Sequence, residues 1–520
     1  MSKKKKYIIL SILITFSIYC SLTIGQSLDE HYHLLQGKIT LDYLFSLGQI
    51  NKDMPYGDFY STIYWSFLYL ITELFPSKYE TSVGHLVNLF FSFATIFGIG
   101  KITSVLFNKK VGSIVFLVLF FYPAFFGHMS INNKDTILAF CHVWMIYLIL
   151  RYIQKQNIKK KANQYVIYLG LLAALATGIQ LTFLGSQIPI IFFILIEIFY
   201  MKKIICKNFS IKVFFFDLAK CFLIFYSVLL IFWKNAHENI ITYPFQAVQK
   251  WMSSDLITGW PYTLVNGDYY LSVDAPASYF LINFIYKSPE YLLLSYLVFL
   301  ILIITSLSFF KKKINFFNYK LYLIFFILAF PNLIMLIIPF PVNDGLRLFL
   351  WTLPYFCIIP GLTIYYFIEN FTYVKQKIVL SSFLILFIYF LTNFILLTPY
   401  QYTYLNSLNG EVKNRYQKFE NDYWATSIEE LVKNANFKTD EILKFTTCGF
   451  ITSSPKQYLK KRPEIKYRFV PYKEAEYIFM TNRVSRFHGV MNCFDLFKGE
   501  DIATVERNGM ILSVIRKIKI

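Results

Sequence analysis

Charged residues are scarce in this 520-residue chain: Asp, Glu, Lys and Arg make up 16% of it, while hydrophobic residues make up 56%. Soluble domains carry about 25% charged residues, so the composition excludes an ordinary soluble enzyme. It also excludes a disordered chain, which would be poor in apolar residues. Cysteine is rare as well, with seven residues, and this excludes a small secreted scaffold held together by disulfides.

Long apolar runs are what the sequence has instead. About 20 apolar residues cross the roughly 30 Å of hydrocarbon in a bilayer. The first run follows a lysine cluster and lacks a convincing small-x-small cleavage site, so we expect an uncleaved helix rather than a signal peptide. The prediction is an all-α polytopic membrane protein with eleven spans, near residues 7–24, 84–107, 112–129, 136–154, 165–184, 186–201, 214–234, 289–310, 320–340, 346–368 and 377–397.

Acidic residues are the rarer charges, 31 against 51 Lys and Arg, which gives a net charge of +20. The basic residues form short clusters in alternate loops rather than one broad face, which argues against a nucleic-acid partner and is typical of cytoplasmic loops. We therefore expect a cytoplasmic N-terminus and an extracytoplasmic C-terminus. The Lys-, Phe- and Ile-rich composition suggests an AT-rich bacterial genome, so the expected location is a bacterial inner membrane. The clusters lie within residues 3–6, 109–110, 151–161, 202–212, 311–320 and 375–377.

Three long segments are expected on the outer side: a first loop at 25–83, a second at 235–288 and a tail at 398–520. Within the first loop, the aromatic-rich stretch from Asp58 to Pro76 is typical of an interfacial helix. Alternating apolar residues in the tail predict a small α/β domain. If the tail is extracytoplasmic, its cysteines Cys448 and Cys493 could form a disulfide.

Ionisable residues gather where the predicted spans meet the outer side. Charges at membrane depth are costly and therefore mark candidate functional sites. Acids and bases at one level of the bilayer predict a site for a charged substrate whose other part is lipid. The residues are Asp29 and Glu30, Lys134 and Asp135, Lys287 and Glu290, and Asp344 and Arg347.

Four segments resemble motifs of one enzyme family. SLDEHYHLLQGK, after the first span, resembles the Asp-Glu signature in the first external loop of GT-C glycosyltransferases, in particular family 39, which includes protein O-mannosyltransferases and aminoarabinose transferases. FFGHMSINNKDTILAF, DGLRLFLWTLPYF, and PYQYTYLN with FENDYWATS resemble further segments of this family in the same order. The resemblance implies a GT-C transmembrane domain over 1–397, with the tail 398–520 as a periplasmic-type domain.

The resemblance also implies a reaction: inverting transfer of a sugar from a polyprenyl-phosphate donor to an acceptor hydroxyl or lipid at the outer face. An alcohol is a poor nucleophile, so a carboxylate must act as general base, with Asp29 the first candidate and Glu30 the second. Charge that develops on the phosphate needs cationic donors, and Arg347 or Lys134 can supply them. Asp135, Asp344 and Tyr56 are expected to position these groups or to bind the acceptor.

Other interpretations remain open from the sequence. The acids could mark a helix end in water, and Arg347 could extend from a helix end toward the interface. The reaction requires no cofactor, although His31 and His33 near Asp29 leave a divalent metal as an alternative. A transporter or flippase of a lipid-linked sugar is the rival function, but such proteins commonly contain repeated halves, and we find no repeat.

Overall fold

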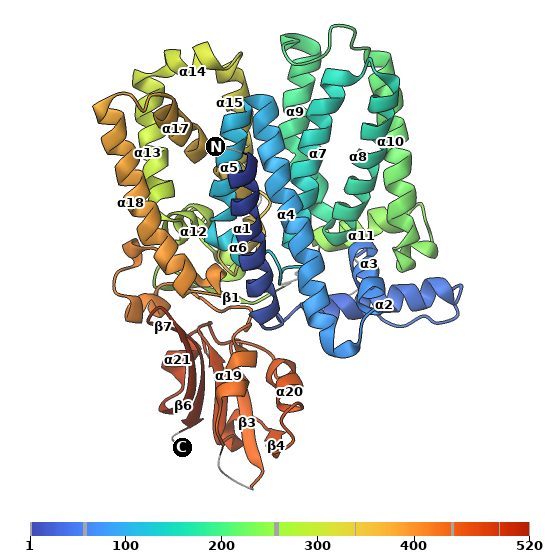
Figure 1. The fold of residues 1–520 in the computed structure, drawn as a ribbon. Coiled ribbons are helices and arrows are strands. Elements are labelled where there is room, and N and C mark those ends of the chain that lie inside the picture. Colours follow the sequence, from blue (N-terminus) through green and yellow to red (C-terminus); the bar gives the residue numbers. More distant parts are fainter. Residues whose placement is uncertain are drawn as a thin grey trace.

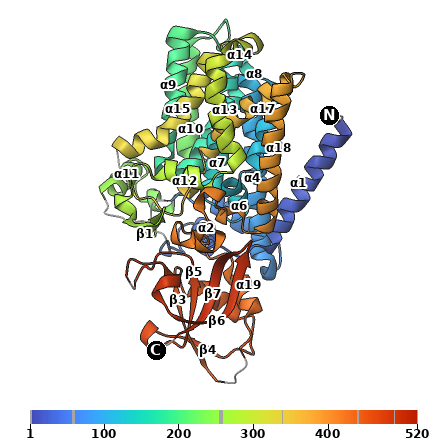
Figure 2. The same cartoon turned by 90° about the vertical axis from the view of Figure 1, so that its left-hand side faces the viewer.

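The fold is described from a computed structural model over residues 3–55, 60–253, 259–337, 340–437, 441–487 and 489–518. A helical bundle forms most of the molecule, and a small sheet lies beyond one end of it (Figure 1). The N-terminus lies toward the other end, and so does α14 (Leu307–Lys313) with its three lysines (Figure 2). The helical bundle thus separates the N-terminus and the lysine cluster of α14 from the sheet.

Seven helical segments in the described part of the chain are long and apolar enough to cross a membrane. The remaining predicted runs coincide with shorter helices or with a pair bent by 114°, α12 (Tyr279–Lys287) and α13 (Glu290–Thr305). The prediction of a helical multi-pass membrane protein is confirmed. The seven are Ser77–Leu106 with α4 (Glu80–Leu106), α7 (Asp135–Lys155), α8 (Lys159–Ile179), Leu181–Met201 with α9 (Ile188–Ile196), α10 (Ile211–Ile231), α15 (Phe317–Ile337) and α18 (Val374–Leu396). The shorter helices are α5 (Lys109–Phe120), α6 (Pro123–His128), α16 (Leu353–Phe356), α17 (Ile358–Glu369) and the apolar part, Tyr7–Thr23, of α1 (Lys3–Thr23).

The loop at 25–83, expected on the outer side, contains two helices, α2 (Glu30–Phe45) and α3 (Ile63–Thr72), of which the sequence predicted only the second. They pack together at the end of the bundle that faces the sheet (Figure 1). Gly37 permits this contact, since a Cβ there would lie 2.2 Å from the carbonyl oxygen of Trp65. Tyr56, predicted to position or bind the acceptor, lies outside the described residues.

The loop at 235–288, the second that we expect on the outer side, packs against the segment that follows the last predicted span. Its helix α11 (Tyr243–Ser253) is followed by a hairpin of β1 (Tyr262–Val265) and β2 (Asp268–Leu271). Val265 forms an isolated bridge with Phe419, and the Gly267 amide donates a hydrogen bond to the Lys418 carbonyl. The hairpin is therefore fixed against the start of the tail.

The tail forms a five-stranded sheet in the order β4-β3-β5-β7-β6. Neighbours β4, β3 and β5 are parallel, while β7 pairs antiparallel with β5 and β6. This mixed sheet, accompanied by short helices, confirms the predicted small α/β fold. The elements are α19 (Ile428–Asn434), β3 (Leu443–Cys448), α20 (Ser453–Leu459), β4 (Tyr467–Phe469), β5 (Tyr477–Thr481), α21 (Cys493–Leu496), β6 (Gly499–Arg507) and β7 (Met510–Ile518).

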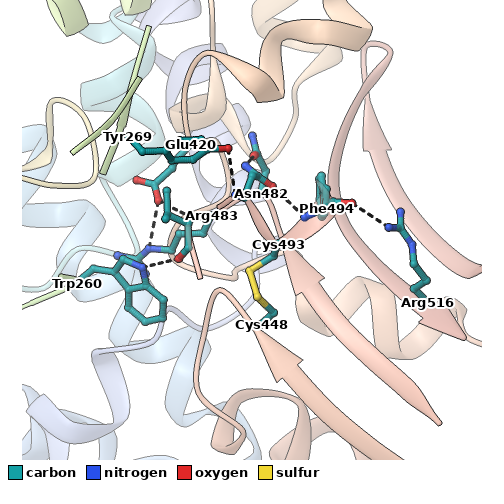
Figure 3. Close-up of a disulfide and its surroundings, with 11 residues drawn as sticks. Trp260, Tyr269, Glu420, Cys448, Asn482, Arg483, Cys493, Phe494 and Arg516 are labelled. Atoms are coloured by element: carbon teal, nitrogen blue, oxygen red, sulfur yellow. Dashed lines mark hydrogen bonds and ion pairs between the residues drawn. A yellow bond between two sulfur atoms is a disulfide. The ribbon is translucent and has the colours of Figure 1, made fainter. Parts of the chain in front are cut away.

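Cys448, at the end of β3, and Cys493, at the start of α21, form a disulfide across 45 positions of sequence (Figure 3). Closing a loop of this length removes unfolded-state entropy worth about 4 kcal/mol. We expect the double variant C448S/C493S to unfold at a lower temperature in detergent, as followed by circular dichroism. C206S, which alters a cysteine outside the disulfide, is the control. Equal unfolding temperatures for the double variant and wild type would contradict the prediction.

Candidate active site

The turn before α16 is built on two residues in the left-handed region, Asp344 with φ 58° and Gly345 with φ 65°. A Cβ on Gly345 would lie 2.6 Å from Nζ of Lys287, so a larger residue would clash as well as being strained. The Gly345 amide donates a hydrogen bond of 2.9 Å to the hydroxyl of Tyr279. The first residue of α12 therefore holds this turn, and the turn places Arg347, two residues further on.

Arg347 lies in a 3-10 turn, Arg347–Phe349, before the apolar helices, whereas the sequence predicted a span starting at 346. Its Nη1 is 2.7 Å from Oδ2 of Asp344, its Nε is 3.6 Å from Oδ2 of Asp135, and its guanidinium lies over the ring of Trp424. Among the described residues, the buried Nε has no hydrogen-bond partner. The arginine therefore retains a donor that an anionic ligand could use.

Asp29 immediately precedes α2 and is half-buried. Burial lowers the pKa of Arg347, but the negative charges of Asp344, Asp135 and Asp29 outweigh burial and raise this pKa above its ordinary value. The charge of Asp29 is thus felt at Arg347. Residues that precede α2, that begin α7 and that form the turn before α16 therefore contribute charge to one region.

The carboxylate of Glu30 is bound by other groups of the protein. Its Oε1 lies 2.9 Å from Nε2 of His85 in α4, and its Oε2 accepts a 2.7 Å hydrogen bond from the Ser27 amide. Both oxygens of this buried side chain are thus held by the protein. These contacts make Glu30 less suited to act as a base than the sequence suggested.

Lys134 and Asp135 begin α7. Asn132 accepts a hydrogen bond from the Asp135 amide at 2.8 Å and donates one to its carboxylate at 3.0 Å, which fixes the carboxylate next to Arg347. Lys134 extends toward Tyr60: its Nζ donates to the hydroxyl at 3.4 Å and lies over the ring. Its half-buried ammonium is a second cation near the site.

The two histidines considered as metal ligands, His31 and His33, have different environments. His31 is exposed, whereas His33 is buried, stacked on Trp65 with 4.3 Å between ring centroids, and bonded through Nδ1 to Asn133 at 2.6 Å. Burial lowers the pKa of His33 to about 4 even though Asp29 opposes the shift, so the ring is neutral at pH 7. In the described part of the chain, no group of three or more His, Cys, Asp and Glu side chains is arranged to hold a metal.

Two charged residues of the tail, Arg483 and Glu420, also belong to this region; Figure 3 shows them close to each other and to Trp260. Nη2 of Arg483 lies 2.6 Å from Oδ1 of Asp344, and Nε lies 4.0 Å from Oε1 of Glu420. Sequence reasoning did not select either one. Glu420 belongs to the motif FENDYWATS, which was a usable signal, while Arg483 lies in a tail segment without a motif.

Glu420 supplies a pH test of this packing. Burial raises its pKa to about 7 despite the opposing charge of Arg483. An acid whose pKa is higher in the folded state stabilises the fold when protonated, so its contribution of about 3 kcal/mol is lost as the pH rises from about 4.5 to about 7. We expect the unfolding temperature of wild type to fall through this window relative to that of E420Q. E411Q, at an exposed glutamate, should keep the wild-type pH profile; an unchanged profile in E420Q would contradict the assignment.

No family model and no curated protein sequence matches the chain. Solved structures do match. ArnT from Cupriavidus metallidurans in the apo state is 10% identical, covers 99% of this chain and 98% of its own, and has a TM-score of 0.53; the same protein bound to undecaprenyl phosphate gives the same values. The apo oligosaccharyltransferase of Archaeoglobus fulgidus is 11% identical, with a TM-score of 0.45 over 96% of this chain and 66% of its own. The chain therefore shares the overall fold of ArnT, an aminoarabinose transferase of the kind that its sequence motifs resemble.

Proposed function

We propose that this protein is an inverting glycosyltransferase that moves a sugar from a polyprenyl-phosphate donor to an acceptor hydroxyl or lipid at the outer face of the membrane. The observation that carries the proposal is the buried Arg347, held by Asp344 and Asp135 with its Nε left without a hydrogen-bond partner among the described residues; the charge of Asp29 also acts on it. A base and an anion-binding group in one place are what this transfer needs. A protein with the same fold has been solved with undecaprenyl phosphate bound, which supports a prenyl-phosphate donor.

In the proposed reaction, Asp29 accepts the proton of the acceptor hydroxyl as its oxygen attacks the anomeric carbon. The bond from that carbon to the phosphate oxygen breaks on the opposite side, so the configuration inverts. The electron pair leaves with the polyprenyl phosphate, and its charge is stabilised by Arg347, with Lys134 as a second cation. Asp135 and Asp344 position the guanidinium through the contacts described above.

The proposed orientation places the N-terminus in the cytoplasm and the tail outside, in a bacterial inner membrane. It is supported by the basic cluster of α14, which lies at the end of the bundle opposite the sheet (Figures 1 and 2). Extracytoplasmic compartments are also where a disulfide such as Cys448–Cys493 persists. The donor would enter between helices, with its prenyl chain in hydrocarbon and its sugar phosphate at the site.

The proposal is tested with purified protein and synthetic polyprenyl-phosphate sugars, with transfer detected by mass spectrometry of the products. Comparing lipid-linked saccharides and surface glycans in cells with and without the gene would then identify the acceptor. We expect a glycosylated product and free polyprenyl phosphate in equal amounts. Movement of a labelled lipid-linked sugar across sealed vesicles without any covalent product would favour the flippase instead.

A further inference from the structure

Arg483 reaches from the sheet domain into the candidate active site. It follows β5, is 3% exposed, and contacts three separate parts of the chain. Its Nη2 lies 2.6 Å from Oδ1 of Asp344, its Nη1 donates to the Tyr423 carbonyl at 2.7 Å, and its guanidinium stacks 4.1 Å from the ring centroid of Trp260 (Figure 3). A buried arginine needs such partners because an unpaired buried charge is costly.

Asp344 is consequently shared between two guanidinium groups. Its Oδ1 faces Arg483, and its Oδ2 faces Nη1 of Arg347, at 2.6 Å and 2.7 Å. A carboxylate with both oxygens free would pair with an arginine in the two-bond, fork-to-fork geometry. Because Arg483 occupies one oxygen, Asp344 cannot bind Arg347 in this way, and the Nε of Arg347 keeps no hydrogen-bond partner among the described residues.

We propose that Arg483 is a positioning residue for the donor phosphate: by holding one oxygen of Asp344, it keeps donors of Arg347 available for the phosphate. This inference rests on the proposed function. Without Arg483, Asp344 would turn both oxygens toward Arg347 and compete with the phosphate for the same donors. The sheet domain would then be a part of the donor site, although its own residues need not touch the sugar.

The backbone around Arg483 is fixed in a way that suits this role. The Cys493 amide donates a hydrogen bond of 2.9 Å to the Arg483 carbonyl, and Cys493 is itself tied to β3 by the disulfide. The next residue, Val484, donates its amide to Glu420 and accepts a bond from the indole of Trp260, at 2.9 Å and 2.8 Å. The guanidinium is therefore presented from a held segment rather than from a free loop.

The test compares full-length wild type with R483Q and R483K. We measure kcat, KM for a polyprenyl-phosphate sugar and for the acceptor, and binding of undecaprenyl phosphate by fluorescence quenching or calorimetry. R483Q should weaken the binding of undecaprenyl phosphate and raise the donor KM by about tenfold. Because Arg347 itself remains, kcat should fall by less than in R347A, and the acceptor KM should change little. R483K, which keeps the charge, should recover part of the affinity. R486Q, at an exposed neighbouring arginine, should behave like wild type.

A cycle with Asp344 separates positioning from damage to the fold. If Arg483 acts through Asp344, the double variant D344N/R483Q should bind undecaprenyl phosphate as tightly as D344N alone. Equal and additive losses in both backgrounds, or an R483Q variant with unchanged donor affinity, would overturn the inference. Where R483Q folds poorly, R483K alone and with D344N gives the same comparison. If the wild-type protein bound the donor but transferred no sugar, the proposed function would be overturned. This result concerns the wild type alone, so it is distinct from any result with the Arg483 variants.

Discussion

An Asp29→Asn variant is expected to transfer sugar about 100-fold to 10,000-fold more slowly than wild type, the range that general base catalysis contributes. Asparagine has nearly the same shape but cannot accept the proton of the acceptor hydroxyl. The loss should appear in kcat, while undecaprenyl phosphate should bind about as well as before or slightly better, since a negative charge near the phosphate is removed. Initial rates with a polyprenyl-phosphate sugar, together with direct binding of undecaprenyl phosphate, measure both quantities.

Glu30→Gln is the matched control, because it makes the same chemical change at the adjacent residue. Both oxygens of Glu30 are held, by His85 and by the Ser27 amide, so we expect a lower unfolding temperature and only a small change in kcat. If E30Q showed the loss of activity that we expect of D29N, while D29N remained active, the two acids would exchange roles. Normal turnover by D29N in membranes supplied with donor would end the assignment of Asp29.

The architecture was predictable because the signals for it are local. Runs of apolar residues and the lysines between them depend on a few neighbouring positions, and most of each predicted run is helical, in one helix or in two. Helix α2 was not predicted, since its sequence EHYHLLQGKITLDYLF mixes polar and apolar residues without a clear stripe. Its formation depends on packing with α3, for which Gly37 provides the close approach, and such contacts are not visible in local patterns.

The candidate site was predictable in part. Asp29, Asp135, Asp344 and Arg347 could be grouped because all lie where predicted spans meet the same side, so the topology alone places them at one level. The network that links Arg483 to Asp344 joins positions 139 residues apart. It depends on how the sheet domain sits against the bundle, and no local sequence signal reports that arrangement.

Arg347→Ala is expected to weaken the binding of undecaprenyl phosphate by about 10-fold to 100-fold, which corresponds to the loss of one or two hydrogen bonds to a charged group. The donor KM should rise in parallel. Because the negative charge on the phosphate grows as the sugar leaves, kcat should also fall. Isothermal calorimetry with undecaprenyl phosphate and initial rates at varied donor concentration separate these effects.

Arg347→Lys distinguishes the geometry of the guanidinium from its charge. Lysine keeps the positive charge but lacks the planar fork that pairs with Asp344 through Nη1 while directing Nε elsewhere. We therefore expect R347K to bind undecaprenyl phosphate with an affinity between those of R347A and wild type. Alanine also leaves the buried carboxylate of Asp344 with one cation fewer, so R347A should unfold at a lower temperature than R347K. If R347A instead bound the donor as tightly as wild type at a reduced stability, Arg347 would be a structural partner of Asp344, and Lys134 would become the cation to test at the phosphate.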